Sequence, residues 1–216
     1  MRLQRSAAAV TTSLLGLLTL AVSLAAPAGA STARARLTPT PRAGYQFSPP
    51  IEEFSPYQPE KFCRKTVEPG VKRFERLLTS TYSGTAIVSD LRPCASDTSE
   101  HYDGRAVDWG VDYRKPSQRA DGKAMLQWLF ATDAFGNRDA MFRRLGLMYI
   151  IWNHRIWGSW DQRWEHYSCK GVTACHVDHM HFSFGWAGAE AKTSYFSHRV
   201  SAPVGYPPHR RTHRRH

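Results

Sequence analysis

Apolar residues recur at helical spacing in the first half of the chain. In residues 68–82 they stand three to four positions apart, so they share one helix face, and Pro69 lies near the start of the segment, where proline is tolerated. Residues 117–133 and 137–146 are also predicted to be helical, and Gly146 is a suitable helix end.

Shorter segments predict strands, with an aromatic-rich loop before the last of them. One segment alternates apolar and polar residues, and another is a short, almost wholly apolar run. The order of elements predicts an α+β fold: a small, mainly antiparallel sheet with helices packed on one face. The predicted strands are residues 85–90, 105–113, 147–152 and 179–184.

Alternation within two of these strands assigns side chains to faces, because residues two apart point the same way. In 105–113 the apolar face includes Trp109, and Asp108 points to the other side. In 179–184 the histidines His179 and His181 lie opposite the apolar side chains. If the two strands are neighbours, Asp108 and His181 converge above the sheet.

The first 30 residues predict a secretory signal peptide. Arg2 and Arg5 precede an apolar run that ends in the small residues Ala28-Gly29-Ala30. No later stretch is apolar enough to span a bilayer, so we expect a secreted protein, extracellular or associated with the cell wall. The rest of the chain is expected to comprise a linker or arm rich in Pro, Ser and Thr (31–61), a folded domain (62–200) and a basic, disordered tail (201–216).

The chain is strongly basic, with a formal net charge of +11. Removing Arg2 and Arg5 with the signal peptide leaves +9, and residues 209–216 carry four Arg and three His. Outside the cell this charge favours anionic cell-wall polymers as partners of the tail. We expect a monomer without a stable nucleic-acid partner.

Four cysteines, an even number, predict disulfides in a secreted protein. Three pairings are possible. We favour Cys63–Cys94 and Cys169–Cys175, because each of these pairs joins near neighbours along the chain.

The residues that carry chemistry fall in two segments, "SEHYDGRAVD" at 99–108 and "DHMH" at 178–181. Gly104 would let the loop of the first segment turn back and bring His101 to Asp108 and His181. Two imidazoles and one carboxylate are a ligand set for catalytic Zn²⁺ with a fourth position left for water. Zinc lowers the pKa of such a water and makes it a nucleophile.

The first segment matches, in every fixed position, the SxHxxGxAxD signature of the zinc D-alanyl-D-alanine peptidases: Ser99, His101, Gly104, Ala106 and Asp108. Over roughly residues 62–187 the chain thus resembles the VanY-like carboxypeptidases and endopeptidases with the hedgehog/DD-peptidase fold. In that group a later ExxH or HxH segment gives the third zinc ligand, which implies His181 here. The resemblance implies a zinc metallopeptidase that hydrolyses peptidoglycan stem peptides or crosslinks.

The resemblance leaves the general base open between Asp178 and His179. Carboxypeptidase members place a Glu three residues before the last ligand, where this chain has Asp178. In HxH members the first His has a catalytic role, which points to His179. We favour Asp178 as the base and His179 as a group that steadies the transition state. Arg92 stands where members often carry an Arg that polarises the scissile carbonyl.

Three further residues are expected to bind substrate. Ser99 is expected to hold His101 through a hydrogen bond within the loop. Residues 152–167 contain four tryptophans, more than one small core needs, so Trp152 and Asn153 are expected to line a groove. Alternative functions are a non-catalytic, zinc-containing cell-wall binding module and, with less support, a secreted metal-dependent nuclease.

Overall fold

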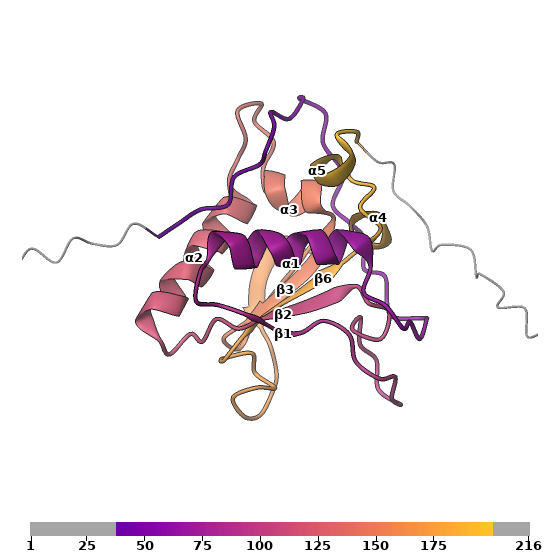
Figure 1. Cartoon of the computed structure of the whole chain (residues 1–216), viewed down its shortest axis with the longest axis vertical. Coiled ribbons are helices and arrows are strands. Elements are labelled where there is room, and N and C mark those ends of the chain that lie inside the picture. The colour runs from indigo at the N-terminus through magenta and orange to yellow at the C-terminus, as the bar shows by residue number, and fades with distance from the viewer. Residues whose placement is uncertain (1–37, 201–216) are drawn as a thin grey trace, which may run out of the picture. The chain divides into compact units, whose positions relative to one another are not determined.

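A computed structural model describes residues 38–200 (Figure 1). The chain divides into two units, Met1–Arg36 and Leu37–His216, and every described residue belongs to the second. The predicted signal peptide (1–30) and basic tail (201–216) lie outside the described residues. Between residues 38 and 200, no helix is both long enough and apolar enough to cross a membrane.

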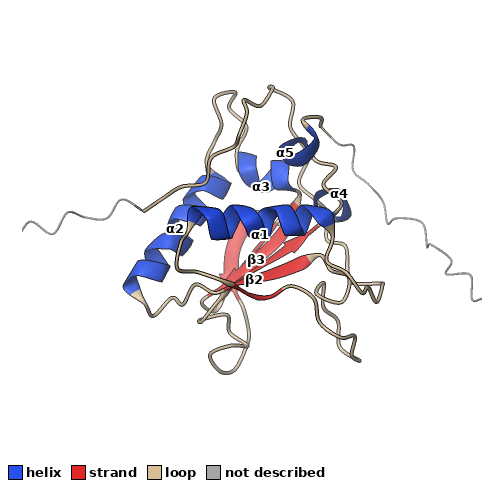
Figure 2. Ribbon diagram, viewed as in Figure 1, coloured by secondary structure: helices blue, strands red, loops and turns tan. Residues whose placement is uncertain are grey.

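The described residues form a mixed structure of helices and strands (Figure 2). The helices are α1 (Pro69–Thr81), α2 (Pro116–Phe130), α3 (Ala140–Leu145), α4 (Trp186–Ala189) and α5 (Ser194–Ser197). The strands are β1 (Ile87–Ser89), β2 (Ala106–Trp109), β3 (Leu147–Trp152), β4 (Arg155–Gly158), β5 (Arg163–His166) and β6 (Met180–Phe184).

All six strands belong to one sheet with the order β1-β2-β6-β3-β4-β5, and every neighbouring pair is antiparallel. The last strand in the sequence, β6, therefore lies between β2 and β3 at the centre of the sheet. This arrangement confirms the predicted α+β class with a mainly antiparallel sheet.

Helices α1 and α2 pack against one face of this sheet (Figure 1). The ring of Phe74 in α1 lies 5.0 Å from that of Phe182 and 5.3 Å from that of Phe184, both in β6. In α2, Gly122 faces Trp152 of β3 so closely that a Cβ would lie 2.5 Å from the indole ring. The apolar side chains of the strands thus face the helices, as the alternation predicts.

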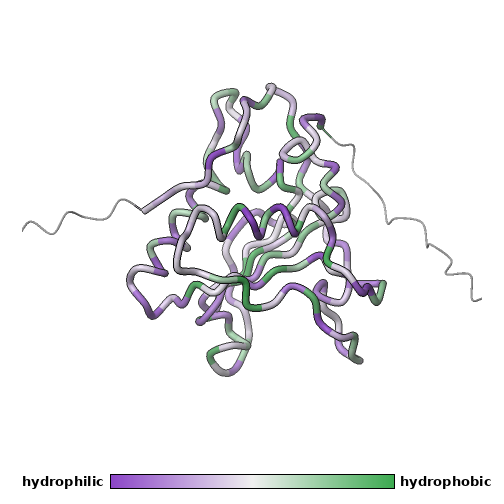
Figure 3. The backbone as a smooth tube through the Cα atoms, in the orientation of Figure 1, coloured by the Kyte–Doolittle hydropathy of each residue, from purple (hydrophilic) through white to green (hydrophobic). Residues whose placement is uncertain are grey.

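Helix α1 follows directly from its sequence. Pro69 occupies the first turn, where its missing N–H costs no helical hydrogen bond. Val71, Phe74 and Leu78 recur on one side and are fully buried. Figure 3 shows the alternation of hydrophilic and hydrophobic residues along this helix. Burial of this apolar face, rather than intrinsic propensity, holds the helix against the sheet.

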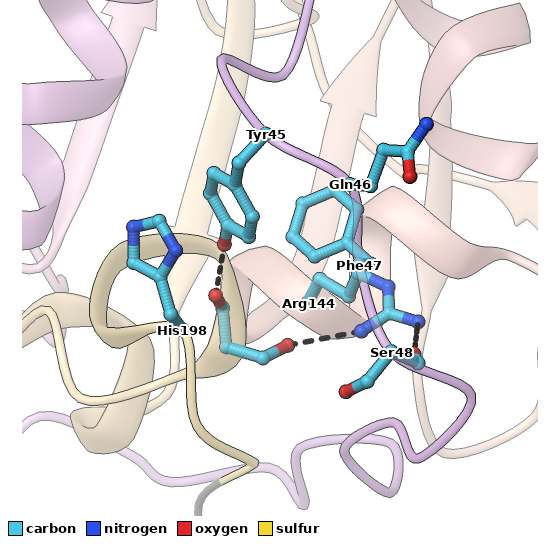
Figure 4. Close-up of a pocket in the computed structure, with 7 residues that line it drawn as sticks. Tyr45, Gln46, Phe47, Ser48, Arg144 and His198 are labelled. Carbon is cyan, nitrogen blue, oxygen red and sulfur yellow. Dashed lines mark hydrogen bonds between the residues drawn. The ribbon is translucent and has the colours of Figure 1, made fainter.

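Residues 38–61, expected to be a linker or arm, contain no helix or strand but lie against the domain. The carboxylate of Glu52 is buried and accepts hydrogen bonds from the backbone N–H (2.5 Å) and hydroxyl (2.7 Å) of Ser194. Arg144 donates to the carbonyl of Ser48 at 3.0 Å and lies under the ring of Phe47 (Figure 4). Polar anchors therefore hold this segment in place.

Both expected disulfides are present. Cys63–Cys94 joins the segment before α1 to the loop after β1, and Cys169–Cys175 closes a short loop before β6. The described residues contain no free cysteine.

Two strands were not predicted. Residues 153–178, expected to be an aromatic-rich loop, contain β4 and β5, which pair so that Trp157 lies opposite Trp164. The turn from β3 to β4 consists of Asn153 and His154, both with positive φ (48° and 62°). This is the backbone of a two-residue hairpin turn, which sequences usually mark with glycine.

Candidate metal centre

The loop 99–105 brings His101 back toward the start of β2. The N–H of Gly104 donates to the His101 carbonyl at 3.2 Å, and the N–H of Arg105 donates to the Glu100 carbonyl at 2.9 Å. Gly104 has φ of +69°, and a Cβ there would lie 2.5 Å from the carbonyl oxygen of Thr66. The predicted role of Gly104 as the turn residue is thus confirmed, because both its positive φ and the lack of room for a Cβ require glycine.

The three predicted metal ligands converge above the sheet. Asp108 of β2 and His181 of β6 are directly paired, and Oδ1 of Asp108 lies 2.8 Å from Nδ1 of His181. Oδ2 of Asp108 lies 3.2 Å from Nε2 of His101. One ligand atom from each residue lies within 4.8 Å of the other two, and all three residues are buried. This cluster could hold a metal ion.

The far nitrogen of each imidazole is fixed by a neighbour. Nδ1 of His101 lies 3.1 Å from the Asp90 carbonyl oxygen, and Nε2 of His181 lies 2.8 Å from Oγ of Ser183. Nε2 of His101, on the inner side, is buried and makes no hydrogen bond. Metal-binding histidines commonly have this arrangement, in which the outer partner sets the tautomer and leaves the inner lone pair available.

The charge states in the cluster also suit a cation. Burial alone would raise the pKa of Asp108, but its interactions with His101 and His181 outweigh burial and hold the pKa far below its usual range. Burial lowers the pKa of His181, against the opposing effect of Asp108. The cluster therefore offers an ionised carboxylate and a neutral imidazole, which are the forms that coordinate metals.

A cavity of about 610 Å³ opens beside the cluster. Of the predicted residues outside the cluster, Arg92, Ser99 and His179 line it. The exposed Arg92 guanidinium donates to Oγ of Ser99 at 2.9 Å, and the same oxygen lies 3.4 Å from the backbone N of His101. The rest of the lining comprises Asp97, Thr98, Glu100, Asp108, Tyr149, Ile151, Tyr167, Thr173, Ala174, His176 and His181.

Asp178 and His179 form a hydrogen-bonded pair next to the cluster. Nδ1 of His179 lies 2.7 Å from Oδ1 of Asp178, and Oδ2 of Asp178 accepts a hydrogen bond from the Thr173 hydroxyl at 2.7 Å. The bonds from Thr173 and His179 lower the pKa of Asp178, overcoming the opposite effect of burial. Nε2 of His179 lies 3.7 Å from Oδ1 of Asp108. His179 lines the cavity, whereas Asp178 does not.

Trp152 and Asn153, the other predicted substrate-binding residues, do not line this cavity. Trp152 is buried toward the helices, where its indole N–H donates to the Val111 carbonyl at 3.0 Å. Both residues border a separate hollow of about 190 Å³ with Tyr113, Lys123, Leu126, Arg155 and Trp164. Trp152 and Asn153 thus line a hollow, as expected, but it is separate from the cavity beside the cluster, because Trp152 points to the helical face of the sheet. Substrate binding by these two residues stays a prediction.

The structure adds cavity residues that were not selected from the sequence. Tyr149 donates its hydroxyl to Oε2 of Glu100 at 2.5 Å, and its ring stacks at 5.5 Å on His181. Burial, and then Glu100, raises the pKa of Tyr149 well above 10. His176 lies with its ring 4.7 Å from that of His179. Burial, and then His181 and His179, lower the pKa of His176 to about 3.

Another group of potential ligand atoms is excluded by covalent chemistry. His154 lies near Cys169 and Cys175, but these two cysteines form a disulfide and have no thiolate to offer.

One comparison with known proteins identifies a family. A family model described as "VldE, C-terminal domain" matches residues 63–178, which include His101, Asp108, His176 and Asp178 and end directly before His179. No curated protein matches the chain, and no solved structure does. Since the matched segment spans more than half of the 216 residues, the chain belongs to the VldE C-terminal domain family.

Proposed function

We propose that the protein is a secreted, zinc-dependent peptidase that hydrolyses peptide bonds in peptidoglycan stem peptides or crosslinks, as a DD-carboxypeptidase or an endopeptidase. The observation that carries this proposal is the convergence of His101, Asp108 and His181 beside a cavity large enough for a peptide. The SxHxxGxAxD pattern and its resemblance to the zinc D-alanyl-D-alanine peptidases supply the substrate class.

The donor set favours zinc over other metals. Two imidazole nitrogens and one carboxylate oxygen suit Zn²⁺, and three protein ligands beside an open cavity are typical of catalytic rather than structural sites. The cysteines that a closed structural site would need are all in disulfides. When bound, zinc would supply Lewis-acid chemistry, which acidifies a water molecule and polarises the scissile carbonyl.

We assign the general base to His179 rather than to Asp178, which the sequence favoured. Both carboxylate oxygens of Asp178 are engaged, and the residue does not line the cavity. Nε2 of His179 faces the cluster, and Asp178 holds Nδ1 on the opposite side of the ring. His179 would accept a proton from the attacking water at Nε2 and deliver it to the leaving amine, while Asp178 stabilises the imidazolium.

Arg92 would stabilise the negative charge that develops on the substrate oxygen. Its guanidinium lies at the edge of the cavity and is oriented by Ser99, which also lies near the backbone of His101. A cation oriented before the reaction needs little reorganisation when the oxyanion forms. In this proposal Ser99 positions Arg92 and the His101 loop and is not a nucleophile.

The remaining features support a site of action outside the cell. Two disulfides in the described residues are typical of oxidising compartments, and the first 30 residues have the pattern of a signal peptide. The net charge of +9 that remains after removal of the signal peptide favours retention on anionic wall polymers, which we propose as partners of a monomeric enzyme.

Digestion of purified peptidoglycan by the zinc-loaded protein, followed by mass spectrometry of the products, tests the proposal. We expect released D-alanine or new amino groups at crosslinks, loss of both after chelation, and recovery on adding zinc. His181→Ala should abolish hydrolysis. His166→Ala, which changes an exposed histidine of β5 away from the cavity, should retain it. Hydrolysis by His181→Ala at the wild-type rate would disprove the mechanism.

The same preparation separates the alternative functions. A zinc-containing protein that sediments with sacculi but releases nothing would indicate a binding module. Clearing of DNA or RNA in a plate assay would indicate a nuclease. His179, a buried imidazole whose Nε2 reaches the cluster, favours catalysis over binding alone.

A further inference from the structure

A second set of potential ligand atoms shares Asp108 with the cluster described above. One atom each from Asp108, His176 and His179 lies within 4.8 Å of the other two. The carboxylate of Asp108 faces both sets. Its Oδ2 lies 3.2 Å from Nε2 of His101, and its Oδ1 lies 2.8 Å from Nδ1 of His181 and 3.7 Å from Nε2 of His179. A carboxylate with partners on both oxygens has the geometry of a bridge between two ions.

Both histidines of the second set have nitrogen atoms available. Nδ1 of His179 is bonded to Asp178, which leaves Nε2 directed at Asp108. Nδ1 of His176 is buried and makes no hydrogen bond. The two rings lie 4.7 Å apart between centroids. Ligand atoms on tetrahedral zinc stand about 3.3 Å apart, so small side-chain rotations would complete the site.

The backbone holds His176 in this position. Its φ is +52°, a conformation that non-glycine residues rarely adopt without support. Its N–H donates to the Thr173 carbonyl at 3.0 Å, and its carbonyl accepts from the N–H of Asn153 at 2.8 Å. The disulfide of the preceding residue, Cys175, closes the same loop. His176 is therefore a pre-positioned side chain at the cavity wall.

We propose that Asp108, His176 and His179 form a second, weaker site for a divalent metal ion such as Zn²⁺, bridged to the first site by the Asp108 carboxylate. The second site is weaker because His176 is only half-buried. In the first site, Asp90 and Ser183 fix the outer nitrogens of both imidazoles.

The second site has a consequence for hydrolysis that rests on the proposed function. An ion held there occupies Nε2 of His179, which is the proposed base. Activity should therefore rise as the first equivalent of zinc binds and fall as the second binds.

Zinc stoichiometry tests the site without reference to activity. Residues 209–216 contain His209, His213 and His216, which could bind zinc themselves, so all three are replaced by Ala in the full mature chain. The metal-free protein is titrated with zinc by calorimetry, and zinc retained after gel filtration is measured by mass spectrometry. His176→Asn is compared with His154→Asn, a matched control with the same positive φ that lies outside the cavity.

We expect two equivalents of zinc in the starting protein, two in His154→Asn and one in His176→Asn. One equivalent in the starting protein would overturn the proposal, and this result needs no variant. Two equivalents in a folded His176→Asn protein would also overturn it. If His176→Asn does not fold, His179→Asn replaces it with the same expectation of one equivalent.

The activity arm separates this inference from the proposed function. In His176→Asn, inhibition by excess zinc should need at least a tenfold higher free zinc concentration than in His154→Asn. If no cell-wall peptide is cut but the second equivalent binds and depends on His176, the proposed function fails and the second site stands. If peptides are cut and only one equivalent of zinc binds, the proposed function stands and the second site fails.

Discussion

Arg105 stands at a variable position of the SxHxxGxAxD pattern, yet its side chain is completely buried. Its guanidinium donates to Oδ2 of Asp103 at 2.8 and 3.1 Å. It also donates to the carbonyls of Phe184 at 2.6 Å and Gln58 at 2.8 Å, and lies 4.6 Å from the Trp186 ring centre. One side chain thus joins the metal-site loop, β6 and the N-terminal segment.

Replacing Arg105 by Met should lower the free energy of unfolding by about 3–5 kcal/mol, the typical cost of removing one partner of a buried ion pair. Asp103 is also fully buried, and its Oδ1 accepts the N–H of Phe62 at 2.7 Å, so the carboxylate cannot easily turn to water. For a domain of this size the loss corresponds to a fall in melting temperature of about 6–20 °C.

Urea denaturation followed by circular dichroism measures this cost. Arg163→Met is a matched control, because the side chains of Arg163 and Glu165 are 69% and 43% exposed, and it should change stability by less than about 0.5 kcal/mol. The double variant Asp103→Asn, Arg105→Met should recover part of the loss, since no unpaired charge remains buried. Equal losses in Arg105→Met and Arg163→Met would refute the reasoning. If the double variant is no more stable than Arg105→Met, the loss of stability comes from packing rather than from an unpaired buried charge.

Three further predictions concern the site and its support. Gly104→Ala should lose more than about 1 kcal/mol of stability and weaken zinc binding in calorimetry. The alanine would have to adopt a positive φ, and its Cβ would lie 2.5 Å from the Thr66 carbonyl oxygen. Asp178→Asn should lower kcat by about 100-fold or more with little change in KM and a shifted pH–rate profile, since Asn cannot stabilise the His179 imidazolium; an unchanged kcat would contradict the assignment. Burial raises the pKa of Tyr195 from 10 to about 12, so the unfolded chain loses this proton first and stability should fall from about pH 10 to 12. Tyr195→Phe should reduce this fall in stability with pH, measured by urea unfolding. An unchanged pH dependence would contradict the role of Tyr195.

The convergence of the three candidate metal ligands could be predicted because strand geometry has a fixed period. Alternation in 105–113 and 179–184 placed Asp108 and His181 on the face opposite the helices, and the pairing of β2 with β6 then brought them together. Only the neighbour relation of these strands was assumed. It is not encoded locally, since β2 and β6 stand more than 70 residues apart, as the hydrogen bond between Asp108 and His181 shows.

The same rule could not place the aromatic residues. Residues 147–152 are almost continuously apolar, so alternation says nothing about which side chains face the cavity. The register with β6 decides it: Ile151 lies opposite His181 on the cavity side, and Trp152 points toward α2. The hairpin of β4 and β5 was missed because its turn, Asn153-His154, reaches positive φ without a glycine.

The proposed exchange of roles between Asp178 and His179 rests on structure outside the motif. β6 begins at Met180, so Asp178 belongs to the preceding loop and is not subject to strand alternation. The Thr173 hydroxyl binds its carboxylate to the loop that Cys169–Cys175 closes, and Asp178 does not line the cavity. In the proposed mechanism the strands therefore place the candidate metal ligands, whereas the loop determines which side chain is positioned to transfer protons. A sequence pattern that records strand positions can predict the first property, but the second depends on hydrogen bonds that only the folded loop creates.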